Sequence, residues 1–120
     1  MASRRMTGLY IVVMIAVIVA VDFVLFKSRP WERLMANPVN AILHVFGRYG
    51  AQAVAVSRCE TGGTFSVYAQ NGQYLGVFQM GFYARSRYGH SWTAIGQARA
   101  AYRYFVDSGR DWSPWECKPW

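Results

Sequence analysis

The sequence predicts an α+β fold that is mainly α, with a short β element, preceded by one transmembrane helix. Three observations support this prediction. Residues 9–26 form an apolar run that contains a single charge, Asp22. Between Thr93 and Val106, apolar residues recur at three- and four-residue spacing, which is typical of an amphipathic helix. Asn71-Gly72 lies among aromatic and β-branched residues and indicates a tight hairpin turn.

The apolar run of residues 9–26 is long enough to anchor the chain in a membrane. As a helix it would span about 27 Å, close to the hydrocarbon thickness of a bilayer. Asp22 lies near its end, where a charge can reach the interface. Arg4 and Arg5, in the basic tail 1–8, also fit a cleaved signal peptide, but the run is long for one and no small-x-small site follows it. We therefore predict an uncleaved single-pass anchor, with secretion after cleavage as the alternative.

The two cysteines indicate on which side of the membrane the rest of the chain lies. Cys59 and Cys117 are the only cysteines, which suits one disulfide that closes the domain on itself; two unpaired buried thiols are the alternative. Disulfides persist outside the cytosol. The cysteine pair therefore predicts that the C-terminal domain is extracytoplasmic. Charge alone does not decide the orientation of the anchor, because basic residues lie on both sides of the apolar run.

Residues 38–120 are predicted to form one domain after a juxtamembrane linker at residues 27–37. Pro38 can begin a helix that Asn37 caps. A second helix is expected from about Ala51 to Cys59, so that Glu60 lies at its end. The remaining expected elements are a two-stranded element within residues 64–79, one or two helical turns within residues 80–88, and a helix from Thr93 to Val106 that ends before Gly109.

Charge and metal-ligand spacing exclude several classes of function. The formal net charge is +7, but it forms no dense basic block of the kind that nucleic-acid binding requires. An anionic cell wall or membrane surface is a better match. His44 and His90 are isolated and lack metal-ligand spacing. We predict no metal, no cofactor and no nucleic-acid partner.

The candidate catalytic residue is Glu60, in Arg58-Cys-Glu-Thr-Gly-Gly. It follows a mostly apolar segment, and a carboxyl held against apolar walls keeps its proton to higher pH and can act as a general acid. Beyond position 37 the only other acidic residues are Asp107, Asp111 and Glu116. The choice of candidate acids is therefore short.

Together with Gly76-Val-Phe-Gln79, Gln97-Ala98 and Trp112-Ser-Pro-Trp-Glu-Cys, this motif resembles the lysozyme-like lytic transglycosylase superfamily. The nearest members in size and cysteine placement are the transglycosylase-like domains of resuscitation-promoting factors, over residues from about 50 to 120. The resemblance implies a small lysozyme-like domain with Glu60 as the catalytic acid and Gln79 in the cleft. It also implies peptidoglycan as the substrate, cut at the β-1,4 bond between N-acetylmuramic acid and N-acetylglucosamine. Tyr74, Tyr102 and Tyr104 are further cleft candidates.

The chemistry expected from the resemblance needs a single carboxyl, because the C6 hydroxyl of the sugar replaces water as the nucleophile. Glu116 is one residue from the expected disulfide and could supply a second carboxyl, which would make the protein a hydrolase. Lys118 is the expected ion partner of Glu116. A different class of function also stays open: a non-catalytic peptidoglycan-binding or structural subunit of a cell-envelope or phage assembly.

Overall fold

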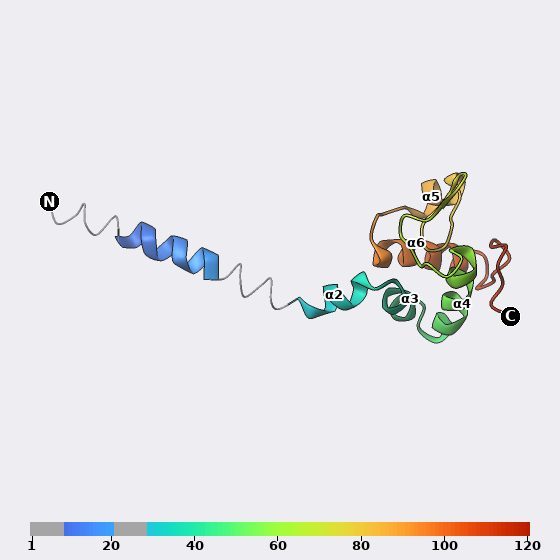
Figure 1. Cartoon of the computed structure of the whole chain (residues 1–120), viewed down its shortest axis with the longest axis horizontal. Helices are drawn as coiled ribbons and strands as arrows, with labels where there is room; N and C mark the ends of the chain where they lie inside the picture. Colours follow the sequence, from blue (N-terminus) through green and yellow to red (C-terminus); the bar gives the residue numbers. More distant parts are fainter. Residues whose placement is uncertain (1–8, 21–28) are drawn as a thin grey trace. The chain divides into compact units, whose positions relative to one another are not determined.

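The computed structural model describes residues 9–20 and 29–120, which are coloured in Figure 1. Residues 9–20 are helical and exposed. No helix within these two ranges is both long enough and apolar enough to cross a bilayer. The basic tail 1–8 and the second part of the predicted anchor, residues 21–26, lie outside the described residues. The chain divides into two compact units, Met1–Glu32 and Arg33–Trp120.

The segment predicted as a linker contains a short helix, α2 (Pro30–Ala36), with no buried residue. Pro30 is the first residue of the helix, where its missing N–H costs no hydrogen bond. Glu32 lies in the first turn and pairs with Arg29, with 3.4 Å between Oε1 and Nη1. A carboxylate there interacts favourably with the helix dipole. Interactions local to the first turn therefore support a helix that buries no residue.

The first two helices of the C-terminal unit begin and end close to the predicted positions. Helix α3 (Pro38–Phe46) begins after Asn37, whose Oδ1 accepts a hydrogen bond from Asn40 N at 3.1 Å. This confirms the predicted cap. A 3-10 turn, η1 (Gly47–Tyr49), leads directly into helix α4 (Gly50–Glu60). Glu60 is thus the last residue of α4, as predicted.

A loop-rich segment, residues 61–81, follows α4 and contains the only two strands in the described part of the chain. Strands β1 (Gln70–Asn71) and β2 (Tyr74–Leu75) are antiparallel, with Gln70 opposite Leu75 and Asn71 opposite Tyr74. Gly72, in the turn, has φ +60°, a conformation that favours glycine. The predicted hairpin is confirmed. We call residues 61–81 the loop segment.

Two helices complete the domain: α5 (Phe82–Tyr88) and α6 (Ala94–Asp107). Thr93 caps α6, since its Oγ1 accepts a hydrogen bond from Gly96 N at 3.1 Å. Figure 1 shows the loop segment (green to yellow) between α4 and α5, with α6 in orange. The fold is mainly helical with one small sheet, as the sequence predicted.

The core lies where α3 packs against α4 and α6, and aromatic side chains fill it. Phe46 and Phe105 come from α3 and α6, and their ring centroids are 5.8 Å apart. Trp112 of the C-terminal tail packs against both rings, and Trp115 packs against Trp112; the two tryptophans are 2% and 4% exposed. A disulfide joins Cys117 of the tail to Cys59 of α4, with 5.9 Å between the Cα atoms. The predicted disulfide is therefore present in the structure.

Candidate functional site

Glu60 is a half-buried carboxyl held between α4 and the C-terminal tail. Its Oε1 accepts a hydrogen bond from the backbone N of Cys117 at 3.1 Å. No group within residues 29–120 donates to Oε2, which is not sealed from solvent. The helix ends here because Thr61 Oγ1 donates to the Ser57 carbonyl at 2.8 Å and accepts from Phe65 N at 3.0 Å, turning the chain away. One oxygen of Glu60 is thus fixed by the fold and the other is free to meet a ligand.

The surroundings of Glu60 favour its protonated form. Burial is the largest effect and raises the pKa of Glu60 above its ordinary value. The Cys117 N–H and the charge of Lys118 lower this pKa, whereas the charge of Glu116 raises it. The net direction is upward, as a general acid requires.

Glu116 is exposed, and its charge reaches Glu60 across the disulfide. The predicted ion pair between Glu116 and Lys118 is not among the ion pairs of the described residues. Lys118 Nζ instead donates to the carbonyls of Trp112, at 3.2 Å, and Trp115. The lysine therefore fastens the tail through two main-chain carbonyls, whereas an ion pair with an exposed carboxylate would add little stability.

Gln79 is held in a fixed orientation at the edge of a pocket. Its backbone has φ +46°, and its side chain is 8% exposed. Nε2 donates to the carbonyls of Ala69 and Gly76, at 2.9 Å in both cases. Because both partners are acceptors, the amide cannot be flipped, and Oε1 is left as the acceptor. Within residues 29–120 no group donates to this oxygen, and it reaches solvent.

The pocket beside Gln79 has a volume of about 220 Å³. Tyr74 and Tyr104, two of the predicted cleft residues, are among its lining residues. The full lining is Gln73, Tyr74, Gln79, Met80, Gly81, Tyr83, Ala84, Tyr104, Pro114 and Trp115. The structure thus brings Gln79, Tyr74 and Tyr104 together around one cavity.

Glu60 is not among the residues that line this pocket, and the tail connects the two. Trp115 lines the pocket, and its Nε1 donates to the Phe78 carbonyl at 2.9 Å. Two residues further on, Cys117 N donates to Glu60. Residues 115–117 therefore run from the pocket to the acid.

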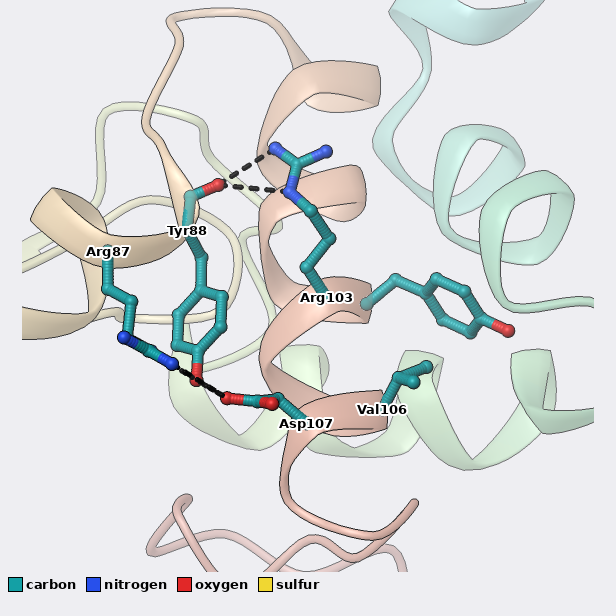
Figure 2. A pocket seen from close by; sticks show the side chains of 6 residues that line it. Arg87, Tyr88, Arg103, Val106 and Asp107 are labelled. Atoms are coloured by element: carbon teal, nitrogen blue, oxygen red, sulfur yellow. Dashed lines mark hydrogen bonds and ion pairs between the residues drawn. The ribbon is translucent and has the colours of Figure 1, made fainter.

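Tyr102 lies in a different place from the other predicted site residues. It lines a pocket of about 560 Å³ with Arg87, Tyr88, Arg103, Val106 and Asp107. Figure 2 shows that Arg103 donates to the Tyr88 carbonyl and that Arg87 pairs with Asp107. The Tyr102 ring packs edge-on against Phe46, with 5.3 Å between centroids. Tyr102 and Tyr104 are two residues apart in α6, and a helix directs such side chains to different faces.

Two buried polar residues that support the site carried no assigned role in the sequence analysis. Ser57 Oγ donates to the Val77 carbonyl at 2.6 Å. Gln97 Oε1 accepts from Val77 N at 2.9 Å, and its Nε2 donates to the carbonyls of Val67, at 3.0 Å, and Ser91, at 2.8 Å. Gly76 allows this approach, because a Cβ there would lie 2.3 Å from Gln97 Oε1. The sequence signal for this supporting role was a polar residue, Gln97, among the apolar residues of the predicted helix 93–106.

Glu60 and Gln79 offer two different hydrogen-bonding functions. Glu60 can donate a proton and accept it back, and Gln79 Oε1 can accept a hydrogen bond from a hydroxyl or amide. No cluster of three possible metal ligands occurs in the described ranges. No family model, curated protein or solved structure matches the chain.

Proposed function

We propose that the chain is a peptidoglycan-cleaving enzyme of the lysozyme-like superfamily, a lytic transglycosylase with Glu60 as its only catalytic carboxyl. One observation carries the proposal: Glu60 ends α4 as a half-buried acid of raised pKa, with one oxygen bonded to Cys117 N and the other open. The raised pKa keeps such an acid protonated to a higher pH than a solvated carboxyl, which favours general acid catalysis.

The reaction uses the same carboxyl twice. Glu60 protonates the glycosidic oxygen, and the bond between this oxygen and C1 of N-acetylmuramic acid breaks. The carboxylate then takes the proton of the C6 hydroxyl of that sugar, and the oxygen attacks C1 to give a 1,6-anhydro product. The nucleophile is already part of the bound substrate, which provides much of the advantage. The Cys117 N–H stabilises the carboxylate between the two proton transfers.

The pocket beside Gln79 supports a glycan substrate. Its wall combines aromatic rings, such as Tyr74 and Tyr104, with one fixed amide acceptor. Aromatic faces suit the C–H surface of a sugar ring, and Oε1 suits its hydroxyl or N-acetyl N–H. In this proposal residues 9–26 anchor the enzyme in the membrane, and the domain acts on the wall outside it. The disulfide supports that side of the membrane.

The test is mass spectrometry of the soluble products from purified peptidoglycan digested with the oxidised full-length chain. We expect anhydromuropeptides from the wild type and a loss of at least about a hundredfold in rate for Glu60→Gln, because the variant has no proton to donate. Glu116→Gln is the matched control, since it removes the neighbouring exposed carboxyl, and we expect it to keep most of the activity. Reducing-end products, or equal losses in the two variants, would instead indicate water as the nucleophile and Glu116 as a second carboxyl.

A non-catalytic wall-binding protein is the second candidate, because Glu60 does not line the pocket that holds Gln79. Sedimentation of the chain with purified cell walls, alongside a turbidity assay of the same walls, separates the two functions. An enzyme clears the suspension. A binding subunit sediments with the walls and leaves the turbidity unchanged.

A further inference from the structure

Two aromatic side chains outside the pocket stack on each other while facing solvent. Tyr68 is 71% exposed and Trp92 is 54% exposed, and their ring centroids are 5.6 Å apart with 23° between the planes. His90 meets Trp92 edge-on, with 4.7 Å between centroids. Large aromatic rings gain stability by burial in a core, so a mutually stacked pair left on the surface indicates a contact site.

The backbone on both sides of Tyr68 is fixed by glutamine side chains. Gln97 Nε2 donates to the carbonyl of Val67, and Gln79 Nε2 donates to the carbonyl of Ala69. Gln97 also donates to the carbonyl of Ser91, the residue before Trp92. One buried amide therefore holds the residues that precede both rings. A contact surface that is ordered in advance loses less entropy when a ligand binds.

One of these hydrogen bonds also links the backbone beside Tyr68 to a residue of the pocket. Ala69, which follows Tyr68, is the residue whose carbonyl orients the Gln79 amide. Gln79 lines the pocket, and no group within residues 29–120 donates to its Oε1. Tyr68 is therefore one residue away from a carbonyl that orients a side chain of the pocket lining.

The surroundings of the pair fit a neutral ligand. The 24 residues from Thr61 to Ala84 contain no Asp, Glu, Lys, Arg or His, and residues 88–98 contain only His90. Burial and the charge of Arg85 lower the pKa of His90, which favours its neutral form. Anionic lipid or nucleic acid would require a cluster of Lys and Arg, whereas, among the residues that the structure describes, Arg85 is the one cation that acts on the pKa of His90. A saccharide requires aromatic faces and uncharged hydrogen-bonding groups, which these two segments provide.

We propose that Tyr68 and Trp92 form a second glycan-binding site, in which the aromatic pair holds N-acetylated hexose units of the strand that enters the pocket at Gln79. This inference rests on the proposed function for its substrate class. The site binds and positions the strand, and takes no part in the proton transfers at Glu60.

The test measures binding of N-acetylglucosamine hexamer to the full-length chain by calorimetry. We expect Tyr68→Ala and Trp92→Ala each to raise Kd by about five- to tenfold, the loss that one aromatic contact accounts for. Trp31→Ala is the matched control, because Trp31 is 55% exposed and lies in α2, and it should leave Kd unchanged. Tyr68→Phe keeps the ring and should retain binding, which separates the loss of a contact from misfolding.

Failure of this inference and failure of the proposed function give different results. A wild type that does not bind the hexamer, or alanine variants with wild-type Kd, would overturn the glycan site even if anhydromuropeptides are released from walls. Conversely, hexamer binding that depends on Tyr68 and Trp92, with no product released from walls, would support the glycan site and overturn the enzyme.

Discussion

The helices of the C-terminal unit and its loop segment are stabilised in different ways. Helices α3, α4 and α6 meet through apolar side chains, with Ile42, Phe46 and Phe105 at most 2% exposed. The loop segment is instead held by hydrogen bonds to its backbone. The domain has four buried polar side chains, and each of them bonds a backbone atom of residues 61–81; they are Ser57, Thr61, Gln79 and Gln97.

This difference bears on the candidate site, because Glu60 borders the loop segment and Tyr74 and Gln79 lie on it. Apolar burial is strong but has no direction, whereas a hydrogen bond adds little net stability and fixes an orientation. Gln79 donates to the carbonyls of Ala69 and Gly76, and Tyr68 lies between two bonded carbonyls. The helices therefore provide most of the stability, and the polar side chains determine how the ligand-facing groups are presented.

The largest effect on stability is expected for a truncation in the helical core. Phe105→Ala removes a fully buried ring that contacts Phe46 and Trp112, and we expect the free energy of unfolding to fall by about 3–5 kcal/mol. Urea unfolding of the variant and the wild type measures this loss of stability. Leu43→Ala, at a side chain that is 45% exposed, should cost far less, and equal losses would show that the core lies elsewhere.

A smaller and more local effect is expected for Gln97→Met, which keeps the side chain's size and removes three hydrogen bonds. We expect a loss of about 2–3 kcal/mol, since Val77 N is left buried without a partner while the two carbonyls can reach water. Amide hydrogen exchange should accelerate most in the loop segment. Gln70→Met, at an exposed glutamine, is the control. Exchange that rises equally in α3 and α6 would remove the distinction between the two regions.

The smallest effect is the pH dependence at Glu60. Its pKa is raised in the folded state, so the folded chain holds the proton more tightly than the unfolded chain. Stability is therefore greatest below the unfolded pKa and falls as pH rises through the folded pKa. Glu60→Gln removes this pH-dependent contribution to stability, and its amide oxygen can still accept the hydrogen bond from Cys117 N. Relative to the wild type, the variant should gain stability as the pH rises from the unfolded pKa of Glu60 through its folded pKa, in denaturation measured at several pH values, and a relative loss would contradict the raised pKa.

Local patterns in the sequence predicted the elements well. The Asn37 cap, the Asn71-Gly72 turn and the Thr93 start of α6 involve residues within a few positions of one another. The position of Glu60 at the end of α4 follows from such local signals. The disulfide followed from the presence of only two cysteines.

The rest could not be predicted because it depends on contacts between distant residues. Ser57 and Gln97 each bond Val77 across 20 positions, and nothing near them in sequence indicates this partner. The preference of Lys118 for tail carbonyls depends on how the tail turns. The separation of Tyr102 from the Gln79 pocket depends on which face of α6 meets the loop segment.

Because Cys117 donates a hydrogen bond to Glu60, the final pKa of Glu60 is set late in folding. The two residues are 57 positions apart, and contacts of such separation form after local ones because closing the chain costs entropy. Helix α4 can form from its own hydrogen bonds, and at that stage Glu60 is a solvated carboxyl of ordinary strength. The hydrogen bond from Cys117 and the charge of Lys118, which both act on its pKa, are in place only after the tail docks. A partly folded chain therefore carries Glu60 without the environment that sets its pKa in the folded state, and the titration of Glu60 reports whether the tail has docked.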